Sequence, residues 1–196
     1  MNSFFALISR MRYIGRWGLM RNSMPENVQE HSHMVAVLTH ALGLIRRDVF
    51  GQPCQVEQLV TAALYHDASE ILTGDLPTPI KYHDANIRTA YKQVEQQACQ
   101  RLVEMLPVEL QGSLAPVIMM EVGKDGSALI KAADKLAALI KCIEERKAGN
   151  LEFSSAEAQT LRALQEMHLP EADWFIERLL PAFECNLDEL EGNEIC

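Results

Sequence analysis

The spacing of apolar residues limits what this 196-residue chain can fold into more than any other feature. Apolar side chains recur every three or four positions along most of its length, and no alternating stretch is long enough to indicate a strand. The stripe formed by Met34, Val35, Leu38, Leu42 and Ile45 is typical of one buried helix face. The pattern predicts an all-α fold, a compact bundle of about seven to nine helices.

Interruptions in this pattern set the expected helix boundaries. One helix is expected from about Asn27 to the Gly51–Pro53 region, and the next from about Val56 to Leu72, before a loop over residues 73–81. Later helices are expected over residues 86–106, 127–147, 154–168 and 171–190, with one or two shorter ones over 107–122. A turn is expected at 123–126 and a left-handed stop at Gly149. No repeat, low-complexity tract or long linker separates them, so residues 1–196 are expected to form a single domain.

The composition excludes several classes of protein. No apolar run approaches the roughly 20 residues that a bilayer span needs, and no leader pattern is present, so a cytoplasmic location without membrane contact is expected. The formal charge of -9 argues against binding a nucleic-acid polymer over a broad basic face. The five cysteines contain no CxxC pair and indicate neither a disulfide framework nor a thiolate zinc site. An anionic substrate would have to be held locally, for example by an arginine of the acid-free segment 1–25.

One short segment concentrates the side chains that could carry chemistry. His66 and Glu70 are four positions apart and Asp67 and Glu70 are three apart, so a helix would place all three on one face. Two carboxylates in an otherwise apolar segment are costly unless a cation compensates for their charge, and a divalent metal does so directly. The segment is therefore a candidate metal site.

Two further residues complete a set of ligands. Asp134 lies in the middle of a predicted helix, where the simplest interpretation is a solvent-facing aspartate paired with Lys131 or Lys135. A lone His31 would likewise be an ordinary core histidine. Together with the His-Asp pair, however, these residues supply two nitrogen and two oxygen ligands, which suit one divalent ion with positions left open for water and substrate.

The sequence around these residues resembles a known pattern. His31, His66-Asp67 and Asp134 are similar to the ligand set of the HD superfamily of metal-dependent phosphohydrolases, which is all-helical and named for the His-Asp dipeptide. The bacterial 5'-deoxynucleotidase branch is the closest resemblance, over nearly the whole chain. It is carried by the segments Gly15–Trp17, Glu26–Ser32, Tyr65–Glu70, Thr73–Lys81 and Lys131–Asp134.

This resemblance implies a role for each matching position. It implies metal ligation by His31, His66, Asp67 and Asp134, and catalytic roles for Glu70 and for Arg16, which would orient the phosphate. The substrate site would comprise Arg16, Trp17, His31, Asp75, Leu76, Pro77 and Thr78. The family hydrolyses 5'-deoxyribonucleoside monophosphates to deoxynucleoside and phosphate with cobalt, manganese, zinc or a similar divalent ion, and is usually a homodimer.

The chemistry of the residues agrees with these roles. A metal can lower the pKa of water and polarise a phosphoryl oxygen, and the Arg16 guanidinium can grip two phosphate oxygens, whereas Lys81 offers only a point charge. Only His83 lies between the His-Asp pair and Asp134, which predicts one metal ion rather than two. The other histidines, His33, His40 and His168, are expected to lie outside the ligand set.

Other interpretations stay open from the sequence. Trp17 could simply pack the N-terminal segment onto the bundle. The substrate could be a triphosphate, a cyclic dinucleotide or a guanosine tetraphosphate, although net acidity and the lack of further basic clusters favour a monophosphate. The chain could also be a nucleotide sensor without turnover, which would not need the proton-transfer group Glu70. Rejection of a ribose 2'-hydroxyl by the 73–81 loop is a further hypothesis.

Overall fold

The structure, a computed structural model, describes residues 2–81 and 84–192. In this range it consists of helices joined by turns and loops, with one isolated antiparallel bridge between Gly15 and Asn27. Among these residues, seven α-helices have nine or more residues: α2 (Val28–Leu44), α3 (Val56–Leu64), α6 (Ala85–Glu104), α7 (Val108–Ile118), α8 (Gly123–Lys147), α9 (Ser154–Gln165) and α10 (Pro170–Arg178). Shorter pieces are α1 (Phe4–Ile8), α4 (Glu70–Thr73), α5 (Thr78–Lys81), α11 (Leu187–Leu190), and the turns η1 (Ser9–Tyr13), η2 (Ile45–Val49), η3 (Leu151–Phe153) and η4 (Leu180–Glu184). The predicted all-α bundle is confirmed.

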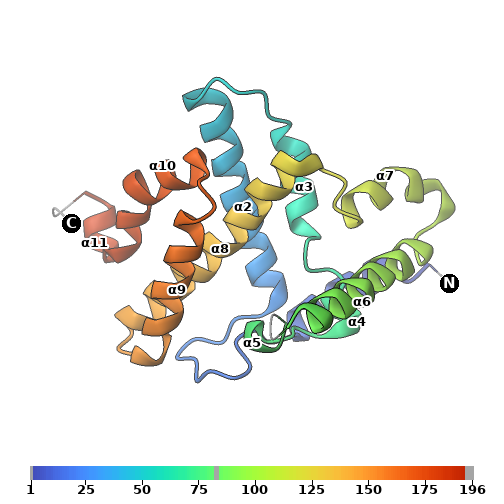
Figure 1. The fold of residues 1–196 in the computed structure, drawn as a ribbon, viewed down its shortest axis with the longest axis horizontal. Helices are drawn as coiled ribbons and strands as arrows, with labels where there is room; N and C mark the ends of the chain where they lie inside the picture. The colour runs from blue at the N-terminus through green and yellow to red at the C-terminus, as the bar shows by residue number, and fades with distance from the viewer. Residues whose placement is uncertain (1, 82–83, 193–196) are drawn as a thin grey trace.

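Helix α8, with 25 residues, runs through the middle of the molecule, with α9 and α10 on one side and α6 and α7 on the other (Figure 1). It packs against α2, which carries the apolar stripe expected from the sequence. Ala132 and Ala133 of α8 are fully buried, and such small side chains let the two helices approach closely. The packed pair α2 and α8 therefore fixes the relative positions of His31 on α2 and Asp134 on α8. None of the described helices is both apolar and long enough to cross a membrane.

The start of α2 is fixed by a capping box. The Asn27 side chain accepts hydrogen bonds from the backbone N–H groups of Gln29 and Glu30, each at 3.0 Å, and the Glu30 carboxylate accepts from the Asn27 N–H at 3.3 Å. The boundary near Asn27 was expected, and the helix continues as the single π-turn η2 before Gly51. The cap holds His31 in the first turn of α2.

The expected helix from Val56 to Leu72 is wrong in its second half. Helix α3 ends at Leu64, and residues 65–69 form tight turns in which Ala68 N–H donates to Tyr65 O at 3.0 Å, three positions back. The reason is tertiary: Ala63 is buried in the core around α2 and α8, whereas Ala68 is buried in a second cluster with Phe4 and Leu102. The chain breaks its helix in order to reach both clusters, and the His-Asp pair lies on the break.

Three smaller expectations also need correction. The turn expected at 123–126 is instead the first turn of α8, which Gly123 opens with a φ of +72°. The loop over 73–81 contains α5, because Pro79 lies in the first helical turn, where proline is tolerated. The helix expected over 171–190 is divided into α10, η4 and α11. The stop at Gly149, with a φ of +84°, is confirmed.

Candidate metal centre and nucleotide site

The four residues proposed as ligands meet at one point, although they come from three separate segments. His31 of α2 places its Nε2 3.0 Å from Oδ1 of Asp134 on α8 and 3.6 Å from Oδ2 of Asp67 in the 65–69 turn. His66 Nε2 lies 3.1 Å from the same Asp67 oxygen. One ligand atom from each of His31, His66 and Asp134 lies within 4.8 Å of the others, and no second such group occurs in the described residues.

The geometry of these atoms fits a shared cation. His31 is fully buried, and both Nε2 atoms face carboxylate oxygens at 3.0 and 3.1 Å without forming a hydrogen bond. On its other side, His66 Nδ1 lies 2.8 Å from the carbonyl oxygen of Ala63, an arrangement that orients a ligating imidazole. Two imidazoles and two carboxylates form a donor set suited to a borderline divalent ion.

The charges in the cluster depend strongly on one another. Burial lowers the pKa of His66, but the negative charges of Asp67 and Asp134 outweigh this effect and raise it to about 9. Burial would raise the pKa of Asp67, yet His66 and His31 hold it well below its usual value. A proton on His66 thus balances part of the carboxylate charge in the absence of a cation, and a bound metal would displace it.

Glu70 lies beside this cluster at the start of α4. Its side chain is buried, and the Oε2 atom has no hydrogen-bond partner. Burial, followed by the negative charges of Asp67 and Asp75, raises the pKa of Glu70 to about 9. A carboxyl group in such surroundings is suited to proton transfer. The expected helix face shared with His66 does not exist, but the tight turn brings Glu70 to the same region.

Arg16 is positioned by pairing between residues 14–16 and 26–28. Its N–H donates to Glu26 O at 2.9 Å, and the Val28 N–H donates to Ile14 O at 3.0 Å, directly before the helix that carries His31. The guanidinium donates through Nε to Glu26 Oε2 at 3.0 Å, and Nη1 lies 3.6 Å from Asp67 Oδ2. The Arg16 guanidinium therefore points at the ligand cluster.

The structure places Trp17 between two contacts. Its Nε1 donates to Glu26 Oε2 at 2.8 Å, and its ring lies 5.2 Å from that of the buried Phe153, centroid to centroid. The backbone of Trp17 has a φ of +59°, a left-handed conformation that bulky residues rarely adopt. The contact with Phe153 agrees with the interpretation of Trp17 as a packing residue. A role of Trp17 in binding substrate stays a prediction.

The other predicted substrate residues follow α4. Asp75, Leu76 and Pro77 are half-buried, and Asp75 is close enough to Arg16 and Asp67 for their charges to affect its pKa. The side chain of Thr78 lies outside the described part of the structure, as does His83. The substrate-binding roles expected for this segment stay predictions.

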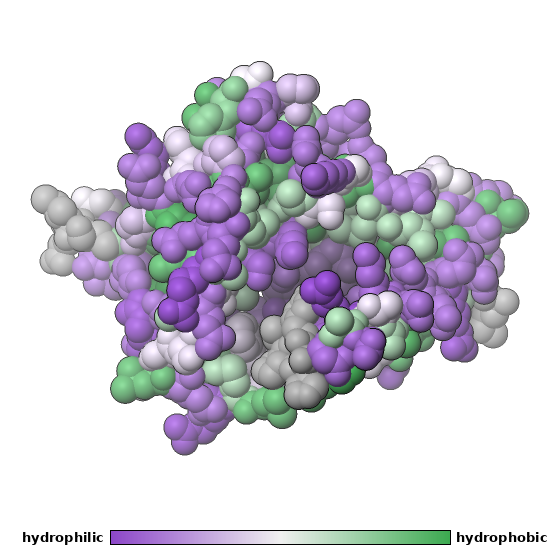
Figure 2. Space-filling model, viewed as in Figure 1, coloured by the Kyte–Doolittle hydropathy of each residue, from purple (hydrophilic) through white to green (hydrophobic). Residues whose placement is uncertain are grey.

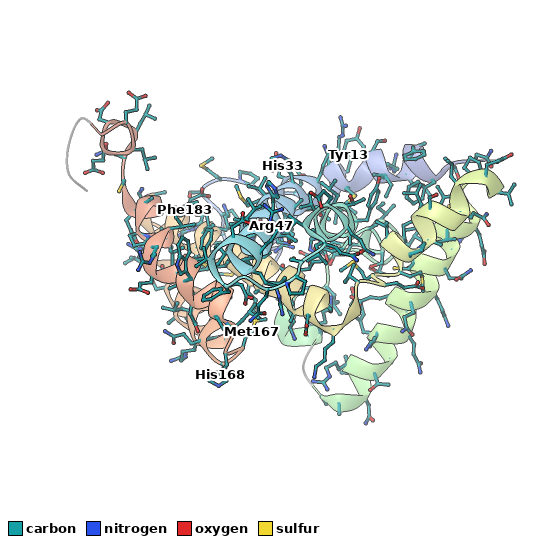
Figure 3. All side chains as sticks on the ribbon, turned by 90° about the horizontal axis from the view of Figure 1, so that it is seen from above. Tyr13, His33, Arg47, Met167, His168 and Phe183 are labelled. Carbon is teal, nitrogen blue, oxygen red and sulfur yellow. The ribbon has the colours of Figure 1, made fainter. Side chains whose placement is uncertain are left out.

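The remaining histidines lie where the sequence placed them. His33, His40 and His168 are exposed, and the labelled rings of His33 and His168 lie at the periphery (Figure 3). Glu26 is the residue that sequence reasoning missed, since it received no role of its own. The available signal was its position as the first acid after the arginine-containing segment 1–25, next to the Asn27 cap.

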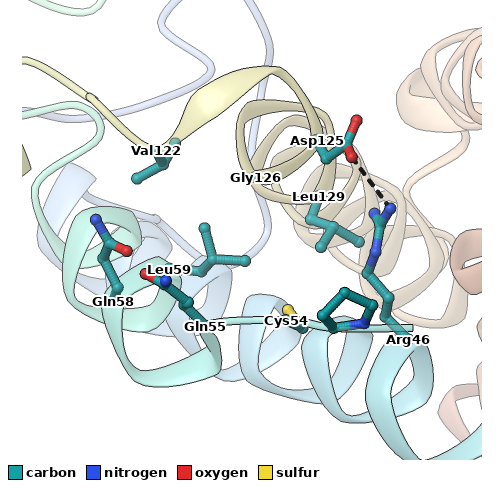
Figure 4. Close-up of a pocket in the computed structure, with 10 residues that line it drawn as sticks. Arg46, Cys54, Gln55, Gln58, Leu59, Val122, Asp125, Gly126 and Leu129 are labelled. Atoms are coloured by element: carbon teal, nitrogen blue, oxygen red, sulfur yellow. Dashed lines mark hydrogen bonds and ion pairs between the residues drawn. The ribbon is translucent and has the colours of Figure 1, made fainter. Parts of the chain in front are cut away.

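A separate cavity of about 160 Å³ lies between α3 and the start of α8 (Figure 4). It is lined by Arg46, whose Nη2 lies 3.4 Å from Asp125 and whose Nη1 lies 3.7 Å from Glu171. This arginine is therefore occupied by structural ion pairs, and none of the candidate site residues lines the cavity. The ligand cluster instead opens at Asp134, whose side chain is 42% exposed. The space-filling view is hollowed beneath α8, between α9 and α6 (Figure 2).

The fold of the described residues is that of the HD-domain phosphohydrolases. An HD-domain phosphohydrolase from Listeria innocua has a similar structure, with a TM-score of 0.81 at 22% sequence identity over 97% of this chain and 94% of that one. The HD phosphohydrolase of cyanophage S-2L, solved with dA and one catalytic Zn²⁺ ion, has a TM-score of 0.65 at 21% identity over 90% and 95% of the two chains.

Sequence comparison narrows this class. Residues 3–183 match the family described as 5'-deoxynucleotidase YfbR-like. The 5'-deoxynucleotidase of Photorhabdus laumondii is 45% identical over 191 residues, 97% of each chain, and that of Vibrio parahaemolyticus is 45% identical over 188 residues, 95% and 97% of the two chains. The chain belongs to the YfbR-like 5'-deoxynucleotidase family, which confirms the resemblance stated from the sequence.

Proposed function

We propose that this chain is a metal-dependent phosphomonoesterase that hydrolyses 5'-deoxyribonucleoside monophosphates to the deoxynucleoside and inorganic phosphate. Its family supports the reaction class and the deoxynucleotide substrate. The observation that carries the mechanism is the meeting of His31, His66, Asp67 and Asp134 beside the Arg16 guanidinium. This arrangement supports a cation site with Arg16 beside it as the residue that binds the phosphate.

His31, His66 and Asp134 would hold one divalent ion, with Asp67 beside both imidazoles as the fourth ligand, and cobalt, manganese and zinc all suit such a donor set. Such an ion supplies Lewis acidity, by polarising a phosphoryl oxygen and lowering the pKa of water. The catalytic Zn²⁺ ion in the cyanophage enzyme supports a divalent ion in this class of protein. That one ion rather than two is bound stays a prediction from the sequence.

Residues of the chain itself then bind the phosphate, transfer a proton and contact the nucleoside. Arg16 binds the phosphate and neutralises charge that grows on its oxygens, because a guanidinium can donate two parallel hydrogen bonds. Glu70 moves a proton at its unpartnered Oε2 while water attacks phosphorus and the bond from phosphorus to the 5' oxygen breaks. Trp17 and the segment 75–78 contact the sugar and base, and an unsatisfied 2'-hydroxyl disfavours ribonucleotides.

Other features expected from the sequence extend this proposal. We propose that residues 1–196 act as a single HD-type domain, in agreement with the family match over residues 3–183. A cytoplasmic location, a homodimer and cobalt as the physiological ion stay predictions from the sequence.

A panel of substrates and metals tests the proposed function. Protein stripped of metal is reloaded with Co²⁺, Mn²⁺ or Zn²⁺, and phosphate release is followed with the four deoxynucleoside monophosphates, AMP, a triphosphate, a cyclic dinucleotide and guanosine tetraphosphate. We expect release from the deoxynucleoside monophosphates only when metal is present, with a lower kcat/KM for AMP than for dAMP. Equal values for AMP and dAMP would refute the proposed ribose discrimination. Turnover of another nucleotide alone, or binding without any turnover, would replace the proposal by the corresponding alternative.

A further inference from the structure

A second group of charged residues on α8 lies apart from the ligand cluster. Glu145 is 1% exposed and Lys141, one turn earlier, is 5% exposed, and the Lys141 ammonium donates to the Glu145 carboxylate. A buried pair of this kind is costly unless further hydrogen bonds satisfy both charges. We call Lys141, Glu145 and Asn150 the loop anchor, because all three also bind the loop of residues 20–26.

The loop anchor holds the backbone of this loop from several directions. Glu145 Oε2 accepts hydrogen bonds from Ser23 N–H at 2.8 Å and Ser23 Oγ–H at 2.6 Å, and Oε1 accepts from the Met24 N–H at 3.2 Å. Lys141 Nζ also donates to Met24 O, and Asn150 Nδ2 donates to Arg21 O at 2.7 Å and to Glu145 Oε2 at 2.8 Å. The position of residues 21–24 is therefore set by α8 and the turn that follows it.

This loop leads directly to the residue that holds the phosphate-binding arginine. Two positions after Met24, the single oxygen Oε2 of Glu26 accepts from both Arg16 Nε at 3.0 Å and Trp17 Nε1 at 2.8 Å. A shift of the loop would move Glu26, and with it the direction in which the Arg16 guanidinium points. Phe153 supports the same assembly, since the Trp17 ring and Lys141 Nζ both lie against its ring.

The geometry of α8 connects this anchor to the ligand cluster. Asp134 and Glu145 are eleven residues apart, which is close to three full turns and about 16 Å along the helix axis. Lys141 lies on the same side, about two turns after Asp134. One face of a continuous helix thus carries both the ligand candidate Asp134 and the residues that hold the loop.

We infer that Glu145, supported by Lys141, is a positioning residue that sets the orientation of Arg16 relative to the metal centre by fixing the loop that carries Glu26. The inference rests on the proposed function, since it assigns Arg16 to the substrate phosphate. Glu145 does not reach the reacting atoms and acts only through the loop. Its loss should weaken the binding of the phosphate while leaving the metal ligands in place.

The test compares E145Q with a matched variant, E157Q. Glu157 of α9 accepts from Arg146, the neighbour of Glu145 on α8, at 2.9 Å, so E157Q also removes one carboxylate from an α8 ion pair but does not touch the loop. With dAMP we expect the KM of E145Q to rise about tenfold with kcat within about threefold, as for a lost contact made equally in ground and transition states. The metal content should equal that of the wild type. E157Q should keep the wild-type KM.

A double-mutant cycle separates positioning from general damage. If Glu145 acts through Arg16, E145Q should raise KM no further in an R16A background, whereas independent effects would multiply. S23A, which removes only the exposed serine hydroxyl, should raise KM about threefold and serves if E145Q does not fold. An unchanged KM in these variants, or multiplicative effects with R16A, would overturn the inference alone. A wild type that releases no phosphate from dAMP would overturn the proposed function and this inference with it.

Discussion

The ligand cluster and the loop anchor both bring charged side chains out of water on α8, but they do so under different conditions. At the loop anchor, both Glu145 oxygens accept hydrogen bonds from protein donors, and the Lys141 ammonium has two acceptors. At the cluster, Nε2 of His31, Nε2 of His66 and Oε2 of Glu70 have no hydrogen-bond partner. The charges of the loop anchor are satisfied within the chain and hold the loop in place, whereas the unsatisfied atoms of the ligand cluster are available to the metal and substrate proposed above.

The largest effect is expected from D67N, which tests whether the cluster needs a cation. Asp67 faces His31, His66 and Arg16 through one oxygen, so its loss should remove bound metal and lower kcat/KM about 10³-fold or more. Metal analysis and phosphate release with dAMP measure both quantities. D125N, at the exposed start of the same helix α8, is the control and should retain both. Full metal content and activity in D67N would show that the ligand cluster does not need Asp67 to bind a metal, and the contrast with the loop anchor would then be wrong.

E70Q separates chemistry from stability within the cluster. Because its pKa is about 9, Glu70 carries a proton at neutral pH without metal, and glutamine closely matches the shape and charge of that form. We expect kcat to fall about 10²- to 10⁴-fold, with the metal content and Tm unchanged. Steady-state kinetics and thermal unfolding of the metal-free protein provide the measurements. A marked loss of Tm would show that Glu70 is a structural residue like Glu145.

E145Q should show the opposite behaviour, with a large effect on stability. Breaking a buried ion pair costs about 3 kcal/mol or more of the free energy of unfolding. Burial would raise the pKa of Glu145, but hydrogen bonds from Lys141 and Ser23 outweigh this and hold it below its ordinary value of 4.5. Its stabilisation is therefore fully present above about pH 4.5 and is lost as the pH falls through the lower, folded-state pKa.

Urea unfolding of wild type and E145Q at several values from pH 7 to pH 3 checks this prediction. The difference in the free energy of unfolding should be constant at neutral pH and should shrink in acid. A difference that is small at pH 7, or that does not change with pH, would show that the carboxylate of Glu145 is not held in its charged form by the loop.

W17F should have the smallest effect. It tests whether the hydrogen bond from Trp17 to Glu26 helps to link the loop anchor to Arg16. Phenylalanine keeps an aromatic ring against Phe153 but cannot donate to Glu26, so Glu26 retains Arg16 as a partner while losing one of its two donors. We expect KM for dAMP to rise about threefold with little change in Tm. An increase far above tenfold would indicate that nucleotide binding depends on the indole N–H itself and not only on an aromatic ring at position 17.

The four ligand candidates could be chosen from the sequence because the reason to group them is chemical and does not depend on backbone detail. Two histidines and two aspartates within largely apolar segments are costly unless they have partners, and one shared cation would account for His31, His66, Asp67 and Asp134 together. The expected helix face over 66–70 was wrong because two apolar clusters pull the chain apart between Ala63 and Ala68, a tertiary effect that local periodicity does not contain. The candidate ligand atoms still converge, because the 65–69 turn brings His66 and Asp67 next to His31 of α2.

The loop anchor could not have been predicted in the same way. Lys141 and Glu145 have the spacing of an ordinary surface ion pair, four residues apart, and only the loop folded over them makes the pair buried. Likewise, the role of Glu26 depends on the pairing of residues 14–16 with 26–28, which leaves no periodic signal in the sequence. Candidate ligands can be recognised in a sequence by their residue type. Residues that position them can be recognised only from their contacts in the structure.

The continuity of α8 has a consequence for how this chain can change its length. Inserting or deleting one residue between Asp134 and Glu145 would rotate one of them about the helix axis by about 100° relative to the other. Asp134 would still face His31, but Glu145 would turn away from the loop, or the reverse. The interval should therefore accept many amino-acid replacements while its number of residues stays fixed, and insertions should be confined to the surface loops outside it.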